Sequence, residues 1–152
     1  MQISEDILLA WGAVAKKYRK NEMIFHEGEA ARYYHQLIEG RVRMYSTTVE
    51  DKEFTQGMFE DGCSFGEPPL FIDEPYPAAA VAIRDSVVLK ISRDIFLTIL
   101  VEYPYLQMEF LHTFAQRIYD KSIATKELIN NSPQDRIAAF LDVYKKKTGS
   151  DN

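Results

Sequence analysis

The segment between residues 65 and 79 carries residue types that could hold a phosphate. Gly66 is followed by the carboxylate of Glu67, and the small residues Ala78 and Ala79 come later in the same segment. A glycine-containing turn frees backbone N–H groups that can converge on a phosphate, and a nearby carboxylate can accept hydrogen bonds from a sugar hydroxyl. The segment predicts an anion-binding turn, with a purely structural turn as the alternative.

Other reactive side chains are isolated along the chain. The histidines His26, His35 and His112 lack the close spacing of metal ligands, which favours structural roles. Cys63 is the only cysteine, which excludes an internal disulfide and a zinc site built on several thiolates. The sequence has neither a Walker loop nor a recognisable Ser, His and Asp set. We therefore expect no enzyme, no catalytic residues and no metal site.

The composition is that of one main globular domain, with 46% hydrophobic and 27% charged residues in a chain of 152. The net charge of -5 argues against this chain alone binding nucleic acid, because phosphate binding draws on clustered Lys and Arg. Its apolar stretches fall far short of the roughly 20 residues that span a bilayer, and no secretory leader is recognisable. We expect a cytoplasmic protein without membrane contacts.

Short β-prone segments separated by glycines dominate residues 13–92. The clearest segments are residues 23–25, 34–38, 41–45, 54–59 and 87–91, and the glycines between them are Gly28, Gly40, Gly62 and Gly66. Short strands with glycine-bearing turns at fairly regular spacing predict a closed or double-sheet antiparallel β domain. We expect a roll or barrel.

Two short helices are expected to flank this β domain. The first covers residues 4–12, with Ser4 as its cap and Gly12 as its end. The second covers residues 93–100, with Ser92 as its cap. The predicted fold class is therefore mainly β with α, that is, α+β.

A much longer helix is expected from Pro104 to about residue 129, because Pro suits a first helical turn and neither Pro nor Gly recurs before Pro133. It would be roughly 35 to 40 Å long, more than a small roll can cover. Residues at the spacing of a coiled-coil seam are Leu111, Phe114, Ile118, Ser122, Thr125 and Ile129. We predict that this helix pairs with its copy in a homodimer, with packing on its own roll as the alternative.

The last segment begins like a new helix. Ser132 is a suitable cap and Pro133 a suitable first helical residue. An apolar face follows, composed of Ile137, Phe140, Leu141 and Tyr144. That face has no later partner in the sequence, which indicates that whatever covers it lies elsewhere.

Two stretches of the chain resemble a known family. They are residues 24–42, with glycines at 28 and 40, and residues 65–82, with Phe65-Gly66-Glu67 and Tyr76-Pro77-Ala78-Ala79. They resemble the roll and phosphate-binding cassette of cyclic-nucleotide-binding domains, most closely those of Crp/Fnr regulators, over roughly residues 20–129. The resemblance implies an antiparallel β-roll of jelly-roll type. It also implies that Gly66 lets the backbone approach a ligand, that Glu67 holds a ribose hydroxyl, and that Ala78 and Ala79 offer amides to the phosphate.

One position departs from the family pattern. Where cyclic-nucleotide binders place an Arg against the cyclic phosphate, this chain has Tyr76-Pro77. A Tyr hydroxyl cannot give the charged, two-pronged contact of a guanidinium, and Pro77 lacks an amide N–H. The loss is worth roughly 1.5 to 3 kcal/mol, or one to two decades of affinity. Cyclic AMP and cyclic GMP are therefore weakened candidates for the ligand. The predicted ligand-binding residues are Phe65, Gly66, Glu67, Tyr76, Pro77, Ala78 and Ala79.

Together these patterns predict the effector-sensing and dimerisation module of a Crp/Fnr-type transcription regulator. The expected organisation is a sensor domain at residues 1–103, a dimerisation helix at 104–131, and the first helix of a truncated DNA-binding domain at 132–152. A small-molecule effector would act in the roll, and DNA would be bound only through a helix-turn-helix domain missing from this chain. The alternatives are a stand-alone protein of the same fold that acts through protein contacts and, disfavoured by its missing metal ligands, a cupin-like enzyme.

Overall fold

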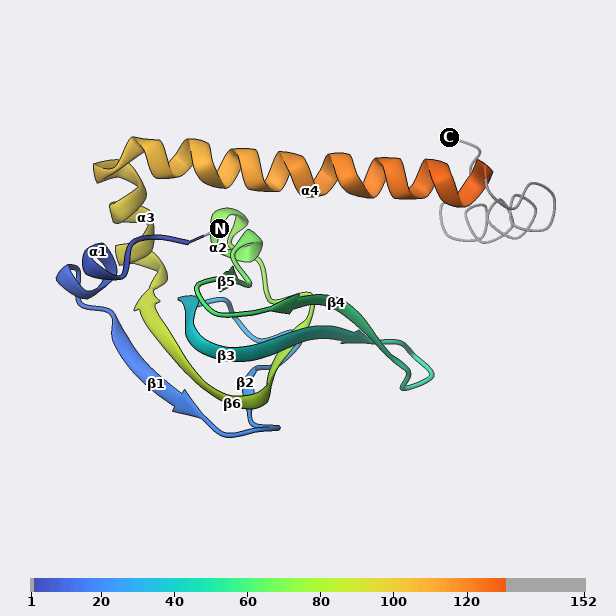
Figure 1. Cartoon of the computed structure of the whole chain (residues 1–152), viewed down its shortest axis with the longest axis horizontal. Coiled ribbons are helices and arrows are strands. Elements are labelled where there is room, and N and C mark those ends of the chain that lie inside the picture. Colours follow the sequence, from blue (N-terminus) through green and yellow to red (C-terminus); the bar gives the residue numbers. More distant parts are fainter. Residues whose placement is uncertain (1, 131–152) are drawn as a thin grey trace. The chain divides into compact units, whose positions relative to one another are not determined.

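The structure is a computed structural model that describes residues 2–130. Within them, six strands form one antiparallel sheet that curls into a roll (Figure 1). In chain order the elements are α1 (Glu5–Ala10), β1 (Val14–Tyr18), β2 (Met23–Phe25), β3 (Tyr33–Thr47), β4 (Glu53–Phe59), β5 (Ser64–Phe65), α2 (Pro68–Ile72), β6 (Ala79–Ser92), α3 (Arg93–Glu102) and α4 (Pro104–Asn130). The roll with its flanking helices and the long last helix confirm the predicted fold class.

Two long strands organise the sheet. The strand order is β1-β6-β3-β4, with β2 paired to β6 and β5 paired to β3, so β3 and β6 carry all the other strands. Alternate residues of a strand point to opposite faces. In β3, His35 and Leu37 therefore point into the roll, whereas Tyr34 and Gln36 point to its other face. The ring of Tyr34 stacks there on Phe96 of α3, with the ring centroids 4.5 Å apart.

The prediction of two separate strands at residues 34–38 and 41–45 was wrong, because both belong to the continuous strand β3. Gly40 lies between them with φ +126°, at a point where the register of β3 against β6 shifts. The Gly40 amide donates to the Asp61 carboxylate over 2.8 Å. The next amide, that of Arg41, donates to the Ser86 hydroxyl over 3.2 Å. A glycine in this conformation lets the strand bend and continue where the sequence pattern indicated a turn.

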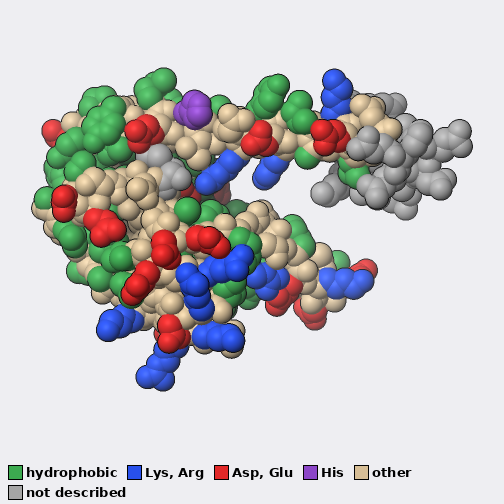
Figure 2. Space-filling model, viewed as in Figure 1, with side chains coloured by type: hydrophobic (Ala, Val, Ile, Leu, Met, Phe, Trp, Pro, Cys, Tyr) green, Lys and Arg blue, Asp and Glu red, His purple; other side chains and the backbone are tan. Residues whose placement is uncertain are grey.

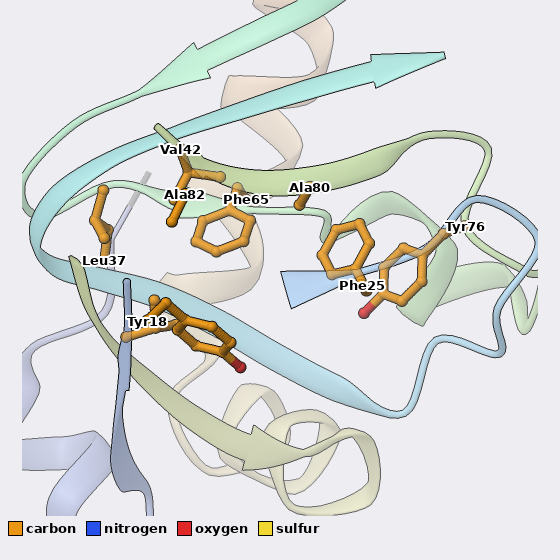
Figure 3. Close-up of a cluster of buried hydrophobic side chains, with 9 residues drawn as sticks. Tyr18, Phe25, Leu37, Val42, Phe65, Tyr76, Ala80 and Ala82 are labelled. Carbon is orange, nitrogen blue, oxygen red and sulfur yellow. The ribbon is translucent and has the colours of Figure 1, made fainter. Parts of the chain in front are cut away.

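The core of the roll is a cluster of buried apolar side chains (Figure 3). Its members come from five strands and from the segment before β6, and they are Tyr18, Phe25, Leu37, Val42, Phe65, Tyr76, Ala80, Ala82 and Val88. The alanines on β6 leave room opposite them for aromatic rings. Aromatic side chains therefore occupy the part of the roll where the sequence placed a ligand.

The predictions for the two short helices had different outcomes. The Ser92 hydroxyl accepts a hydrogen bond from the Ile95 amide over 3.3 Å, which confirms the cap of α3. Ser4 stands at the start of α1, but its side chain makes no capping hydrogen bond, so that prediction was wrong. Ser4 contributes its carbonyl instead, which accepts from the Leu8 amide over 3.1 Å. Gly12, with φ +98°, follows the end of α1 as predicted.

The long helix α4 runs from Pro104 to Asn130, as the sequence predicted. The chain divides into two compact units after Met108, so the start of α4 belongs to the unit that contains the roll. Residues 131–152, which include the predicted start of a DNA-binding domain, lie outside the described residues. Over the part that the structure describes, no helix is both long and apolar enough to cross a membrane.

Candidate functional site

The predicted ligand-binding residues come from two segments that meet at one end of the roll. Phe65 ends β5, Gly66 forms the turn, and Glu67 precedes α2. The segment from Tyr76 leads into β6, which begins at Ala79. The short helix α2 between the two segments was not predicted, because its five residues begin with two prolines and show no helical periodicity.

Gly66 is needed at this turn for both conformation and space. Its φ is +73°, a backbone conformation that favours glycine. A Cβ added at Gly66 would lie 2.9 Å from the Phe25 ring and 3.3 Å from the Tyr76 ring. The glycine therefore allows two aromatic rings of the chain itself to lie close to its backbone. The expectation that it also admits a ligand stays a prediction.

The rings of Phe25 and Tyr76 form a tight stacked pair (Figure 3), with their centroids 3.7 Å apart and their planes inclined by 6°. Phe25 also lies next to Phe65, at a centroid distance of 6.2 Å. Both members of the stack are only 2% exposed. A ligand that approached Gly66 from inside the roll would have to separate this pair.

Tyr76 is held in place at its backbone and at its hydroxyl. Its amide donates to the Glu29 carbonyl over 2.9 Å, and its carbonyl accepts from the Gly28 amide over 2.8 Å. Its hydroxyl donates to the Tyr33 carbonyl over 3.3 Å. Burial, and to a smaller extent the negative charge of Glu29, raises the pKa of the Tyr76 phenol. Tyr76 is therefore a neutral donor within the core.

The carboxylate of Glu67 is completely buried. Its Oε2 accepts a hydrogen bond from the Ser64 hydroxyl over 2.7 Å, and its Oε1 has no partner among the described residues. Ser64 lies opposite Gln36 in the pairing of β5 with β3, so it points to the same face as Gln36, away from the roll interior. The carboxylate expected to hold a ribose hydroxyl is therefore engaged on the outer face of β3.

That outer face carries a buried polar cluster. The Gln36 side chain accepts from the Ile3 amide over 2.8 Å and donates to the Ile3 carbonyl over 2.7 Å. The Tyr34 hydroxyl donates to the same side-chain oxygen of Gln36 over 2.5 Å. Burial raises the pKa of Tyr34, and the charge of Glu67 acts in the same direction. The cluster links β3 to the N-terminal segment at Ile3 through neutral hydrogen bonds.

The small residues before and at the start of β6 are packed into the sheet. Ala78 is 1% exposed and Ala79 is 5% exposed. The Pro77 carbonyl accepts from the Ser46 hydroxyl over 2.9 Å, and Ala79 lies opposite Tyr45 of β3. These contacts fix the backbone from Pro77 to Ala79, the segment in which the resemblance implies phosphate-binding amides.

His35 is a polar side chain inside the roll and is only 2% exposed. Its ring lies between Phe25 and Phe65, at a centroid distance of 5.4 Å from each. Its Nδ1 has no partner within the described part of the chain. Burial, with the positive charge of Lys90 as the next cause, lowers the pKa of His35 to about 3. The buried imidazole is therefore neutral at ordinary pH, which agrees with the structural role expected from the sequence.

We predict that His35 makes the protein sensitive to mild acid. The unfolded chain takes up a proton on this imidazole near pH 6.5, whereas the folded form does so only near pH 3. The free energy of unfolding should therefore fall as the pH drops through that window, and the contribution is absent above it. Urea denaturation of the wild type and of His35→Phe between pH 7 and pH 4 measures the difference. Equal pH dependence in both proteins would contradict the prediction.

An open depression of about 480 Å³ lies outside the roll interior. It is formed by three short segments, residues 30–32, 73–75 and 92–94. Its wall carries both signs of charge, and Arg93 is already engaged: its Nε donates to the Leu70 carbonyl over 2.7 Å. The depression has no residue in common with the predicted ligand-binding set. Among the residues described, no group of His, Cys, Asp and Glu is arranged to hold a metal.

A curled antiparallel sheet, a short helix after a Gly-Glu turn and a long helix after the last strand together define a domain of the β-roll class. The chain belongs to the cyclic nucleotide-binding domain family, whose family model matches residues 15–103. The fold is that of the cyclic nucleotide-binding roll. A similar segment also occurs within a larger protein, since 115 residues of this chain are 27% identical to 7% of the lysophospholipase nte1 of Aspergillus oryzae.

Known relatives confirm the resemblance to Crp/Fnr-type regulators. The cyclic AMP receptor protein of Thermus thermophilus is 24% identical over 124 residues, which are 82% of this chain and 57% of that relative. The crystal structure of the Thermus thermophilus catabolite activator protein matches with a TM-score of 0.74 at 24% identity, over 81% of this chain and 57% of that one. The sensor domain of the transcriptional regulator DNR from Pseudomonas aeruginosa matches with a TM-score of 0.66 at 27% identity, over 75% of this chain and 76% of that one. This chain thus spans little more than half of the first relative.

Proposed function

We propose that the chain is the effector-sensing and dimerisation module of a Crp/Fnr-type transcription regulator that acts in the cytoplasm. A small molecule bound in the roll would change how two copies of α4 pair, and this change would control a DNA-binding domain that starts near Ser132. The observation that carries the proposal is a cyclic nucleotide-binding roll followed by a long helix with exposed apolar residues.

The exposed residues of α4 support pairing with a second copy. Leu111 is 59% exposed and Ile118 is 67% exposed, and both belong to the predicted seam. The seam continues through Ser122 and Thr125, whose hydroxyls donate back to the carbonyls of Ile118 and Lys121 over 3.0 and 2.8 Å. Burying two apolar stripes against each other would remove these side chains from water.

The proposed effector binds at the turn around Gly66, and its binding is coupled to movement of the Phe25–Tyr76 stack. Cyclic AMP and cyclic GMP are the candidates that the family favours. Tyr76-Pro77 offers them no charged contact, and the stack fills the space in front of Gly66. The free energy of binding would be reduced by the cost of separating these two buried rings. We therefore expect any binding of these nucleotides to be weak, or an effector of different chemistry to take their place.

DNA binding is assigned to the proposed helix-turn-helix domain and not to the roll. On the face of the roll drawn in Figure 2, basic and acidic side chains are interspersed. The net charge of the chain is -5. That face therefore does not provide the clustered cations that contact a phosphate backbone.

The test of this proposal is the mass of the particle in solution. Sedimentation velocity of the whole chain should give the mass of two copies, and Ile118→Glu should weaken the association by about two decades because it places a carboxylate in the apolar seam. Gln116→Glu is the matched control, since it adds the same charge on the opposite side of α4. A wild type that remains monomeric at high concentration would contradict the dimer.

The same measurement with cyclic AMP or cyclic GMP added tests the effector. A nucleotide-dependent change in association or shape supports the sensor role. A dimer that responds to neither nucleotide at millimolar concentration, and whose calorimetric titrations are flat, would exclude these two effectors and leave an effector of another class.

A further inference from the structure

The inward face of the roll becomes cationic at the end formed by β1 and the second half of β6. Tyr18 and Val88 belong to the buried core of the roll. Lys16 lies two residues before Tyr18 on β1, and Lys90 lies two residues after Val88 on β6. Both lysines therefore point to the same inward face as these core residues. Lys16 lies opposite Val88 and Lys90 opposite Val14 in the pairing of β1 with β6, which makes the two lysines diagonal neighbours.

Both ammonium groups lie over aromatic rings. Lys90 Nζ is 4.5 Å from the centre of the Tyr33 ring, and Lys16 Nζ is 4.9 Å from the centre of the Tyr18 ring. Neither lysine forms an ion pair with any residue that the structure describes. Two like charges are thus held side by side without a compensating carboxylate in contact.

The electrostatics agree with this geometry. Burial and the charge of Lys16 lower the pKa of Lys90, and the charge of Glu29 acts in the opposite direction. The Glu29 carboxylate is turned toward His26, from whose Nδ1 it is 3.4 Å away. The lysine pair therefore has unused capacity to bind an anion, and Glu29 is the nearby negative charge that opposes it.

The lysine pair adjoins the predicted ligand-binding residues. Lys90 lies directly opposite His35 across β3 and β6. The Tyr33 ring, which carries the Lys90 ammonium, is 44% exposed, and the Tyr33 carbonyl accepts the hydrogen bond from Tyr76. A ligand bound on Tyr33 and Lys90 would therefore be open to solvent. It would also contact Tyr33, whose carbonyl accepts the hydrogen bond that holds the Tyr76 hydroxyl.

We propose that Lys16 and Lys90 bind the carboxylate or phosphate of a small aromatic effector, whose ring packs against Tyr33. The proposal rests on the proposed sensor function and names the chemical class of its ligand. The two ammonium groups supply the positive charge that Tyr76-Pro77 does not. They do so from β1 and β6, and not from the segment before β6 where the family places its arginine. The part of the Tyr33 ring that the Lys90 ammonium leaves open gives a flat apolar surface for the ligand body.

Titration of the whole chain with benzoate and with phenyl phosphate, followed by amide chemical shifts, tests the site. We expect saturable shifts at Tyr33, Lys90 and Lys16 with either anion, and the stronger of the two identifies the preferred anionic group. Benzyl alcohol, the neutral probe, should bind at least about tenfold more weakly. Equal affinity for benzoate and benzyl alcohol, or no shifts at these residues at millimolar concentration, would overturn the proposal.

Variants separate the charges that matter from those that do not. Lys16→Gln and Lys90→Gln should each weaken binding of the preferred anion by about tenfold, and Glu29→Gln should strengthen it. Lys17→Gln is the matched control, because Lys17 lies on β1 with its side chain on the opposite face. Should Lys90→Gln fail to fold, Lys90→Arg retains the charge and must bind the anion. Unchanged affinity in both Gln variants would overturn the assignment.

Failure of the proposed lysine site can be distinguished from failure of the proposed sensor function. Anion binding that depends on the lysines in a chain that stays monomeric would uphold this site and contradict the proposed dimerisation mechanism. Cyclic AMP binding that shifts Gly66 and Ala78 and is insensitive to Lys16→Gln and Lys90→Gln would uphold the sensor role and contradict this site.

Discussion

Gly40→Ala should lower the free energy of unfolding by about 3 kcal/mol or more. The φ of Gly40 is +126°, a conformation that costs a residue with a side chain on the order of 1 to 3 kcal/mol. In addition, an alanine Cβ would lie 2.1 Å from Ser86 Oγ and 2.7 Å from Ser86 Cα. Because the Cα belongs to the backbone of β6, relief requires the two central strands to move apart. Urea denaturation at neutral pH measures the loss.

Gly28→Ala is the matched control for this prediction. Gly28 also has a positive φ, +87°, but a Cβ added there would meet nothing within 4 Å. We expect a loss of about 1 kcal/mol from backbone strain alone. Similar losses at Gly28 and Gly40 would show that the close approach of β3 to β6 is not what requires a glycine at position 40.

Tyr76→Ala should cost about 3 kcal/mol of folding stability, because it removes a buried aromatic ring and leaves a cavity beside Phe25. Tyr76→Phe should cost less than about 1 kcal/mol, since it keeps the stacked ring and loses one long hydrogen bond to the Tyr33 carbonyl. Thermal and urea denaturation of both variants provide the comparison. If the two losses are alike, the hydroxyl and not the ring stabilises this end of the roll.

The pair of variants also reports on the proposed ligand site. With alanine at position 76, the space in front of Gly66 is no longer filled by the stacked ring. A small ligand that enters the roll from this side should then bind more readily to Tyr76→Ala than to Tyr76→Phe. The same affinity for both would indicate that the ligand does not displace Tyr76.

The sequence predicted those features that depend on local chemistry. Ser92 is a good cap in any context, and the absence of Pro and Gly after Pro104 is enough to predict the long helix. The glycine pattern, together with the family resemblance, predicted the β-roll. The continuous course of β3 was missed because a glycine between two apolar segments has the same pattern whether the chain turns or bulges.

The arrangement of the candidate site depends on contacts between distant residues and was only partly predictable. Nothing near Tyr76 in the sequence indicates that its ring would stack on Phe25, some fifty residues earlier in the chain. The direction of Glu67 depends on Ser64 and on the pairing of β5 with β3. Strand alternation did contain a signal for Lys16 and Lys90, but only once the inward face of β1 and β6 was known.

The hydroxyls of Ser122 and Thr125 are satisfied within their own helix, which affects how two such helices would meet. Each already donates to a carbonyl one turn earlier, so neither needs a polar partner across an interface. Toward a second copy of α4, Ser122 and Thr125 would present mainly small carbon surfaces. Such surfaces permit close approach of two helices but do not by themselves specify one alignment. In the proposed dimer, the choice between alternative alignments would then depend on the larger side chains of the seam, Leu111, Phe114, Ile118 and Ile129, and not on these hydroxyls.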